Sequence, residues 1–317
     1  MKKNKGTEVC IDMLAMEALA HCELCPRRCG VNRLAGERGF CGAGELVRVA
    51  LVSLHPWEEP CLVGKNGAGT VFFSHCSLRC VFCQNAAISS EGEGIAVTPA
   101  RLADIFLEQQ ARGAATLDLV TPTHYAPQIA AALLAAREQG FSLPVVWNSG
   151  GYDTVELVAA LAGLVDVYLP DLKYGDEASA RRYSSAPDYF AAAAAAIEAM
   201  AAQTGAPQPG ADGVLRRGVL VRHLVLPGRR HESMRLLDWL WERFGDGVWL
   251  SLMNQYTPLY RAAEFPEINR RLMTFEYQSV VEHALDLGIT HCYVQEGKTA
   301  SAKFVPVFDG RGVLPEK

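Results

Sequence analysis

The chain has 317 residues, of which 50% are apolar and 9% aromatic, and its formal net charge is −5. Such a chain buries a substantial core, which excludes a disordered or fibrous protein, and its mild acidity gives no general attraction to nucleic acid or anionic lipid. Charged residues or glycines interrupt every apolar run before about 18 residues and the basic start leads into no apolar signal core, so we expect a cytoplasmic protein that contacts neither nucleic acid nor membrane.

The predicted elements begin with a short helix over 13–21 and continue with a segment, 22–44, that has neither helical nor strand periodicity. Alternation predicts a strand over 46–54, and β-branched and aromatic residues predict the first buried strand over 70–74. Later strands are expected over 116–121, 144–148, 165–169, 219–226 and 248–253, and helices over 98–113, 126–139, 154–161, 189–203, 232–244 and 274–287.

Short apolar strands separated by helices are typical of parallel β/α units, because parallel neighbours need crossover connections and are covered on both faces. Six such units fit the pattern better than eight. The sequence therefore predicts an α/β fold, an incomplete (β/α)6 barrel over 67–317, preceded by a Cys-rich extension over 1–66. Its chemistry is expected at the C-terminal ends of the strands.

Of the ten cysteines, eight lie between Cys22 and Cys83. Without an export signal, such crowding favours metal or redox chemistry over disulfides. Cys76, Cys80 and Cys83 follow the first buried strand with spacings of three and two residues. Three thiolates on one loop can hold three irons of a cubane and leave the fourth iron open to a non-protein ligand. The alternatives are a zinc knuckle or three unrelated core thiols.

With Phe82 before its last cysteine, this loop resembles the signature of the radical S-adenosylmethionine (SAM) superfamily. The resemblance implies a partial β/α barrel, a 4Fe-4S cluster whose open iron binds SAM, and reductive cleavage of SAM to a 5′-deoxyadenosyl radical that abstracts hydrogen. It also implies a reductant such as flavodoxin or ferredoxin. Further stretches resemble the pyruvate formate-lyase activating enzyme-like branch, in its poorly characterised subgroup: 57–61, 67–70, 121–125, 168–174, 222–228 and 252–256.

Several residues are candidates for binding SAM. Asn148 ends the third barrel strand and can donate and accept hydrogen bonds. Asp171 and Lys173 are two residues apart at a strand end, so they project to one face as SAM contacts or as a structural ion pair. Arg222 and His223 alternate across a strand, and the resemblance favours Arg222 toward the SAM carboxylate.

The resemblance adds Phe82, Thr123, His124 and Gln255 as cofactor contacts. One departure concerns the Gly-Gly-Glu with which many superfamily members bind the SAM amine. This chain has Thr121-Pro122-Thr123-His124 at that place. His124 is either a ligand contact or a histidine that is hydrogen-bonded locally.

A second group comprises Cys22, Cys25, Cys29 and Cys41, with spacings of two, three and eleven residues. Four thiolates can close a zinc site or hold a second iron–sulfur cluster, and either metal would order this irregular segment. Cys61 is interpreted as a core thiol.

Three functions follow from these features. The first is an oxidoreductase resembling pyruvate formate-lyase activating enzyme, which abstracts hydrogen from a glycine of a glycyl radical enzyme partner. The second is a radical SAM enzyme that acts on a small molecule or a peptide. The third is a non-catalytic iron–sulfur or zinc protein.

Overall fold

The computed structural model describes residues 13–295 and 306–315. The strands are β1 (Val47–His55), β2 (Ala68–Phe73), β3 (Ile95–Val97), β4 (Leu117–Val120), β5 (Val145–Ser149), β6 (Val167–Pro170), β7 (Gln208–Pro209), β8 (Leu215–Leu224), β9 (Trp249–Met253) and β10 (Cys292–Val294). The α-helices are α2 (Pro60–Val63), α3 (Ala86–Ser89), α4 (Pro99–Ala111), α5 (Ala126–Glu138), α6 (Val155–Ala160), α7 (Glu177–Ser184), α8 (Tyr189–Thr204), α9 (Arg230–Phe244) and α10 (Thr274–Asp286). The 3-10 helices are η1 (Met16–Ala20), η2 (Thr123–Tyr125), η3 (Gly245–Gly247) and η4 (Ala262–Glu264).

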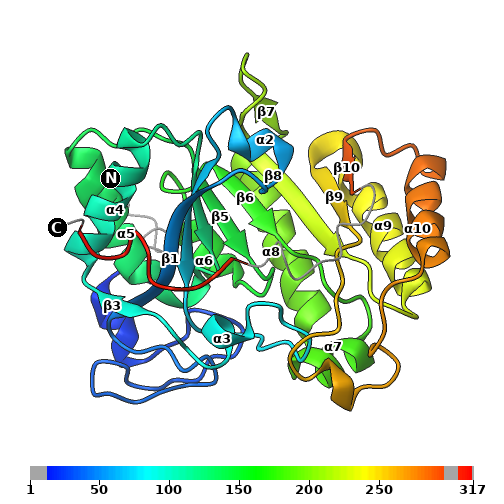
Figure 1. The fold of residues 1–317 in the computed structure, drawn as a ribbon, viewed down its shortest axis with the longest axis horizontal. Helices are drawn as coiled ribbons and strands as arrows, with labels where there is room; N and C mark the ends of the chain where they lie inside the picture. Colours follow the sequence, from blue (N-terminus) through cyan, green and yellow to red (C-terminus); the bar gives the residue numbers. More distant parts are fainter. Residues whose placement is uncertain (1–12, 296–305, 316–317) are drawn as a thin grey trace, which may run out of the picture.

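The strands form one sheet in the order β10-β9-β8-β6-β5-β4-β2-β1-β3, with β7 attached to β8. Neighbours from β2 to β10 are parallel, whereas β1 pairs antiparallel with β2 and β3. Within the described residues β10 and β3 do not pair with each other, so the barrel is open. Helices α4 and α5 cover one end of the sheet, and α9 and α10 cover the other (Figure 1).

Helix α4 illustrates how the sequence sets an element. The Thr98 side chain accepts a hydrogen bond from the Arg101 backbone N–H at 3.2 Å and caps the helix, and Pro99 occupies its first turn. Leu102, Ile105 and Phe106 lie on its buried face, and burial of each such side chain stabilises the fold by about 1.5–3 kcal/mol.

The prediction of an incomplete parallel barrel is confirmed, and the six predicted barrel strands correspond to β2, β4, β5, β6, β8 and β9. The six strand–helix units that the sequence predicts are present, and β10 follows the last of them as a further parallel strand beside β9. Helix α7 was missed, because its composition is polar and its buried face carries few apolar side chains: Ser179, Ala180, Tyr183 and Ser184. The predicted helix over 13–21 is the 3-10 helix η1.

None of the helices in the described ranges is long and apolar enough to cross a lipid bilayer.

Candidate functional site

The loop after β2 carries three cysteines and is fixed at both ends by backbone hydrogen bonds. His75 N donates to Ile88 O at 2.7 Å, and Val81 N donates to Tyr183 O at 2.9 Å. These bonds attach the loop to α3 and α7. His75 and Arg79 have left-handed φ values of 74° and 50°, which non-glycine residues adopt only where the surroundings favour them. The packing around the loop therefore determines its shape.

The thiols of Cys76, Cys80 and Cys83 each accept a hydrogen bond. Leu78 N donates to Cys76 Sγ at 3.4 Å, Ser184 Oγ to Cys80 Sγ at 2.9 Å and Ser89 Oγ to Cys83 Sγ at 3.2 Å. Burial raises the pKa of the Cys76 thiol to about 12 and also raises the pKa of Cys83. A metal that binds these sulfurs has to displace their protons, and the three donors stabilise the thiolates that result.

The three cysteines line a cavity of about 410 Å³ at the C-terminal ends of the strands. This volume lies within the range that small organic ligands occupy. No group of three or more His, Cys, Asp or Glu side chains in residues 13–295 and 306–315 is placed to hold one metal ion as it stands. A cubane does not need such convergence, because each thiolate binds a different iron.

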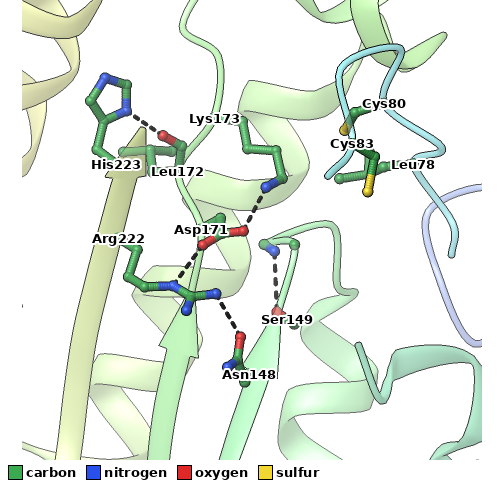
Figure 2. A network of polar contacts seen from close by, with 12 residues as sticks. Leu78, Cys80, Cys83, Asn148, Ser149, Asp171, Leu172, Lys173, Arg222 and His223 are labelled. Atoms are coloured by element: carbon green, nitrogen blue, oxygen red, sulfur yellow. Dashed lines mark hydrogen bonds and ion pairs between the residues drawn. The ribbon is translucent and has the colours of Figure 1, made fainter. Parts of the chain in front are cut away.

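A polar network lies across the cavity from this loop (Figure 2). Arg222 on β8 is its centre: Nε donates to Asp171 Oδ1 at 2.8 Å, Nη1 to Glu58 Oε1 at 3.2 Å and Nη2 to Asn148 Oδ1 at 2.6 Å. Lys173 Nζ donates to the other oxygen of Asp171 at 2.5 Å. The ends of β5, β6 and β8 therefore bring an amide, one carboxylate and two cations to one wall, and the turn after β1 adds the carboxylate of Glu58.

The charges in this network are unequally compensated. Burial alone would raise the pKa of Asp171, but Arg222 and Lys173 hold it below its ordinary value, so this carboxyl is ionised. Burial, followed by the nearby Glu58, raises the pKa of Asp118 well above its ordinary value. Asp118 Oδ2 accepts from the Asn148 amide at 3.4 Å, and its Oδ1 finds no partner among the described residues.

Most residues predicted to contact the cofactor lie on this cavity. They are Phe82, Asn148, Asp171, Lys173, Arg222 and Gln255, together with the three cysteines. Arg222 lines the cavity, whereas His223 points away and bonds Leu172 O and Ser233 Oγ, in agreement with the predicted alternation.

Thr123 and His124 do not line the large cavity. Thr123 Oγ1 donates to Asp153 Oδ1 at 2.6 Å, and His124 Nε2 lies 2.8 Å from Ser74 O. Both side chains are buried, and burial lowers the pKa of His124 to about 3. The structure therefore supports the local hydrogen-bonding interpretation of His124. Neither side chain is positioned to contact a ligand in the large cavity.

Sequence reasoning missed Asp118 and the two serines that donate to Cys80 and Cys83. Asp118 could have been found, because it is a charged residue in the middle of an otherwise apolar strand. Ser89 and Ser184 gave no such signal, since they reach the sulfurs from α3 and α7, which were not predicted.

The four N-terminal cysteines also come together. Cys22, Cys25, Cys29 and Cys41 line a second cavity of about 10 Å³ next to the cysteine loop. Cys61 is buried in α2 against the sheet and lines neither cavity, as expected for a core thiol.

Two comparisons with known proteins identify the family of this chain. The family model described as the radical SAM superfamily matches residues 70–240. Uncharacterized protein MJ0674 of Methanocaldococcus jannaschii is 32% identical over 289 residues, which cover 86% of this chain and 76% of that protein.

Two solved structures of Streptococcus suis SuiB are also similar, each at 13% identity. The structure bound to precursor peptide SuiA gives a TM-score of 0.47 and covers 72% of this chain. The structure bound to S-adenosylmethionine gives a TM-score of 0.46 and covers 70% of this chain. This chain spans 48% of SuiB in both comparisons, about half of its length.

Proposed function

Because this chain belongs to the radical SAM superfamily, we propose that Cys76, Cys80 and Cys83 hold a 4Fe-4S cluster and that the cavity beside them binds SAM. The family implies both cofactors. When bound, they supply a carbon-centred radical that abstracts hydrogen from a substrate. The observation that carries the proposal is that three cysteines and a charged network face one another across a single cavity.

The residues present fit these groups. In the described part of the chain, no fourth cysteine lines the cavity, so a cubane on this loop keeps one iron for a non-protein ligand. The ammonium of Lys173 lies on the side of Asp171 that faces Cys80 and Cys83 (Figure 2). Lys173 and Arg222 can bind a carboxylate, and Asp171 and Asn148 can accept hydrogen bonds from an amine or from ribose hydroxyls.

Glu58 is a further acceptor for the SAM amine, in place of the Gly-Gly-Glu that this chain lacks. Glu58 lines the cavity and lies beside Asp118. A cation bound there would lower the raised pKa of Asp118, because opposite charge favours the ionised form.

The cavity wall also has to exclude water and rival hydrogen donors from a reactive radical. Phe72, Phe73, Leu78, Ile88 and Met253 supply apolar lining between the charged groups. Removal of water from such a site prevents side reactions.

For the substrate, we propose a glycine Cα in a loop of a glycyl radical enzyme, with flavodoxin or ferredoxin as the electron donor. The rim of the cavity supports a protein substrate, because the Trp57 side chain is 73% exposed there. An exposed tryptophan offers a surface on which another protein can pack. The alternative is a radical SAM enzyme for a small molecule or a peptide.

The first test is formation of 5′-deoxyadenosine by reconstituted, dithionite-reduced protein with SAM. We expect product from the wild type and from Cys61→Ala, a control in a buried cysteine outside both cavities, and none from Cys80→Ala. Absence of product from wild type that carries its cluster would leave the non-catalytic alternative.

The second test adds partner proteins. A glycine-centred electron paramagnetic resonance doublet on a partner enzyme supports the activase function. Consumption of a small molecule or peptide, with no doublet on any partner, would replace it with the alternative. We also propose that Cys22, Cys25, Cys29 and Cys41 bind a second metal, either zinc or iron–sulfur.

A further inference from the structure

Backbone hydrogen bonds in the segment 13–45 bring its four cysteines together. Cys22 N donates to Val31 O and Gly30 N donates to Cys22 O, both at 3.0 Å, which closes a loop around Cys25 and Cys29. Cys41 approaches from the other side. A Cβ atom added to Gly39 would lie 2.8 Å from Cys29 Sγ, so glycine is needed there for the chain to pass this close to Cys29. The four thiols then line one cavity.

The size of this cavity separates the two metals. Its volume is about 10 Å³, against about 410 Å³ at the cysteine loop after β2. A cavity of this volume holds roughly one water-sized particle. The space between the four thiols therefore matches a single ion, whereas a cubane with four irons and four sulfides would require the surrounding side chains to move apart. Among single ions, zinc favours a closed tetrahedron of four thiolates.

Backbone donors around these sulfurs suit thiolates. Ala43 N donates to Cys41 Sγ at 3.4 Å, and Arg27 N donates to the sulfur of Cys25. In both cases the donor lies two residues after the cysteine. Hydrogen bonds to sulfur ligands are a common means of stabilising metal sites.

Arg33 supplies an independent observation. It is only 1% exposed, and its guanidinium donates to Gly44 O at 3.1 Å, to His124 O at 2.6 Å and to Cys22 Sγ at 3.8 Å. No carboxylate of the described residues forms an ion pair with it. A buried cation without a counterion is strongly unfavourable. Zinc with four thiolates carries a net charge of −2 and would provide the missing counterion.

The same segment contacts the cysteine loop directly. Arg79 Nη2, on that loop, donates to Cys41 O at 3.3 Å. Arg27 Nε donates to Ser77 O at 3.0 Å, and the guanidinium groups of Arg27 and Arg79 lie over the Phe40 ring, 3.9 Å and 5.5 Å from its centre. An ion that fixes Cys25 and Cys41 would therefore also fix the outer face of the loop after β2.

We infer that Cys22, Cys25, Cys29 and Cys41 bind one zinc ion, which has a structural role and holds the N-terminal segment against the cysteine loop. This inference rests on the proposed function only for the second metal. As the described side chains stand they do not converge on one ion, so the cysteine side chains have to move when the ion binds.

Metal analysis of a Cys76→Ala, Cys80→Ala, Cys83→Ala triple variant tests the inference. This variant lacks the ligands of the proposed cluster and makes no 5′-deoxyadenosine whether or not zinc is bound, so the two proposals fail separately. We expect about one zinc per chain in this variant, in the wild type and in the Cys61→Ser control. Further replacement of Cys25 and Cys41 by Ser should remove it.

About four irons per chain in the triple variant would show a second cluster and overturn the zinc assignment. Absence of both metals would overturn the site itself. If the Cys25→Ser, Cys41→Ser protein does not fold, cobalt substitution of the soluble triple variant decides. Intense visible bands of tetrahedral, thiolate-bound Co²⁺ support the site, and the weak spectrum of a hydrated ion contradicts it.

Discussion

Replacement of Arg222 by alanine tests the network at the cavity wall. Arg222 is largely buried and donates to Asp171, Glu58 and Asn148. Its removal leaves Asp171 and Glu58 near each other with Lys173 as the remaining cation of the network. Removal of one partner from a buried ion pair costs about 3–5 kcal/mol, because an uncompensated charge stays behind.

This cost can be converted into a change in melting temperature. A chain of 317 residues has an unfolding entropy of about 0.7 kcal/mol/K, so the expected decrease in Tm is about 4–8 °C. The matched control is Arg216→Ala, which removes an exposed i,i+4 pair with Asp212. An exposed pair contributes about 1 kcal/mol or less, so the control should melt within about 2 °C of the wild type.

The pH dependence gives a second reading of the same variant. In the folded wild type the pKa of Asp171 is lowered. Its stabilising contribution is therefore present above the unfolded pKa of about 3.9 and is lost as the pH falls through the folded pKa. The difference in Tm between wild type and Arg222→Ala should be largest near neutral pH and should shrink toward pH 4, where the unpaired carboxylates of the variant take up protons. A difference below 2 °C, or one that does not change with pH, would refute this reasoning.

Three further predictions concern single residues. Ser184→Ala removes the O–H donor to Cys80 Sγ, so the reduction potential of the cluster should fall relative to that of the control variant Ser279→Ala on α10. A redox titration followed by electron paramagnetic resonance measures this potential, and an unchanged value would contradict a role for this bond. Burial, followed by the neighbouring Glu58, raises the pKa of Glu59 to about 7, so the stability of the wild type should decline as the pH rises from about 4.5 to 7. In thermal unfolding, the stability of Glu59→Gln relative to the wild type should therefore be greater at pH 8 than at pH 5, by up to about 3 kcal/mol. Parallel pH profiles for the two proteins would be the contrary result. Arg27→Ala removes hydrogen bonds to Ser77 O and Ser184 O. A chelator should therefore extract cluster iron from this variant faster than from the wild type or from the control Arg28→Ala at an exposed position. Equal rates would show that this contact does not hold the loop.

The sequence could predict most of the barrel because its local signals agree with the tertiary structure. Helix α4 shows this agreement, since the Thr98 cap, Pro99 and the buried stripe all indicate the same start and face. Strand alternation placed only one of Arg222 and His223 on the cavity side of β8, and the family resemblance selected Arg222. Helix α7 carried no comparable signal.

The turn after β4 could not be predicted. Thr121 adopts a left-handed φ of 61°, which a β-branched residue seldom does, and the chain then enters η2. This turn buries Thr123 and His124 and leaves Thr121 on the cavity. Nothing in the four-residue motif marks Thr121 for this conformation. The placement of Thr123 and His124 depends on their contacts with Asp153 and Ser74, which lie far from them in the sequence.

The contacts between the four N-terminal cysteines and the loop after β2 were likewise beyond the sequence. The cysteine spacing indicated that Cys22, Cys25, Cys29 and Cys41 share one site, and the structure brings them to one cavity. That Arg79 donates to Cys41 O depends on how two irregular segments pack, for which no periodic pattern exists.

Three cysteines on the loop after β2 leave one iron of a cubane for SAM. Mössbauer spectra of protein reconstituted with ⁵⁷Fe report on each iron of such a cluster. We expect a cubane in which addition of SAM changes the signal of one iron and leaves the other three unchanged. A spectrum without a cubane component, or a cubane in which no iron signal responds to SAM, would refute this arrangement.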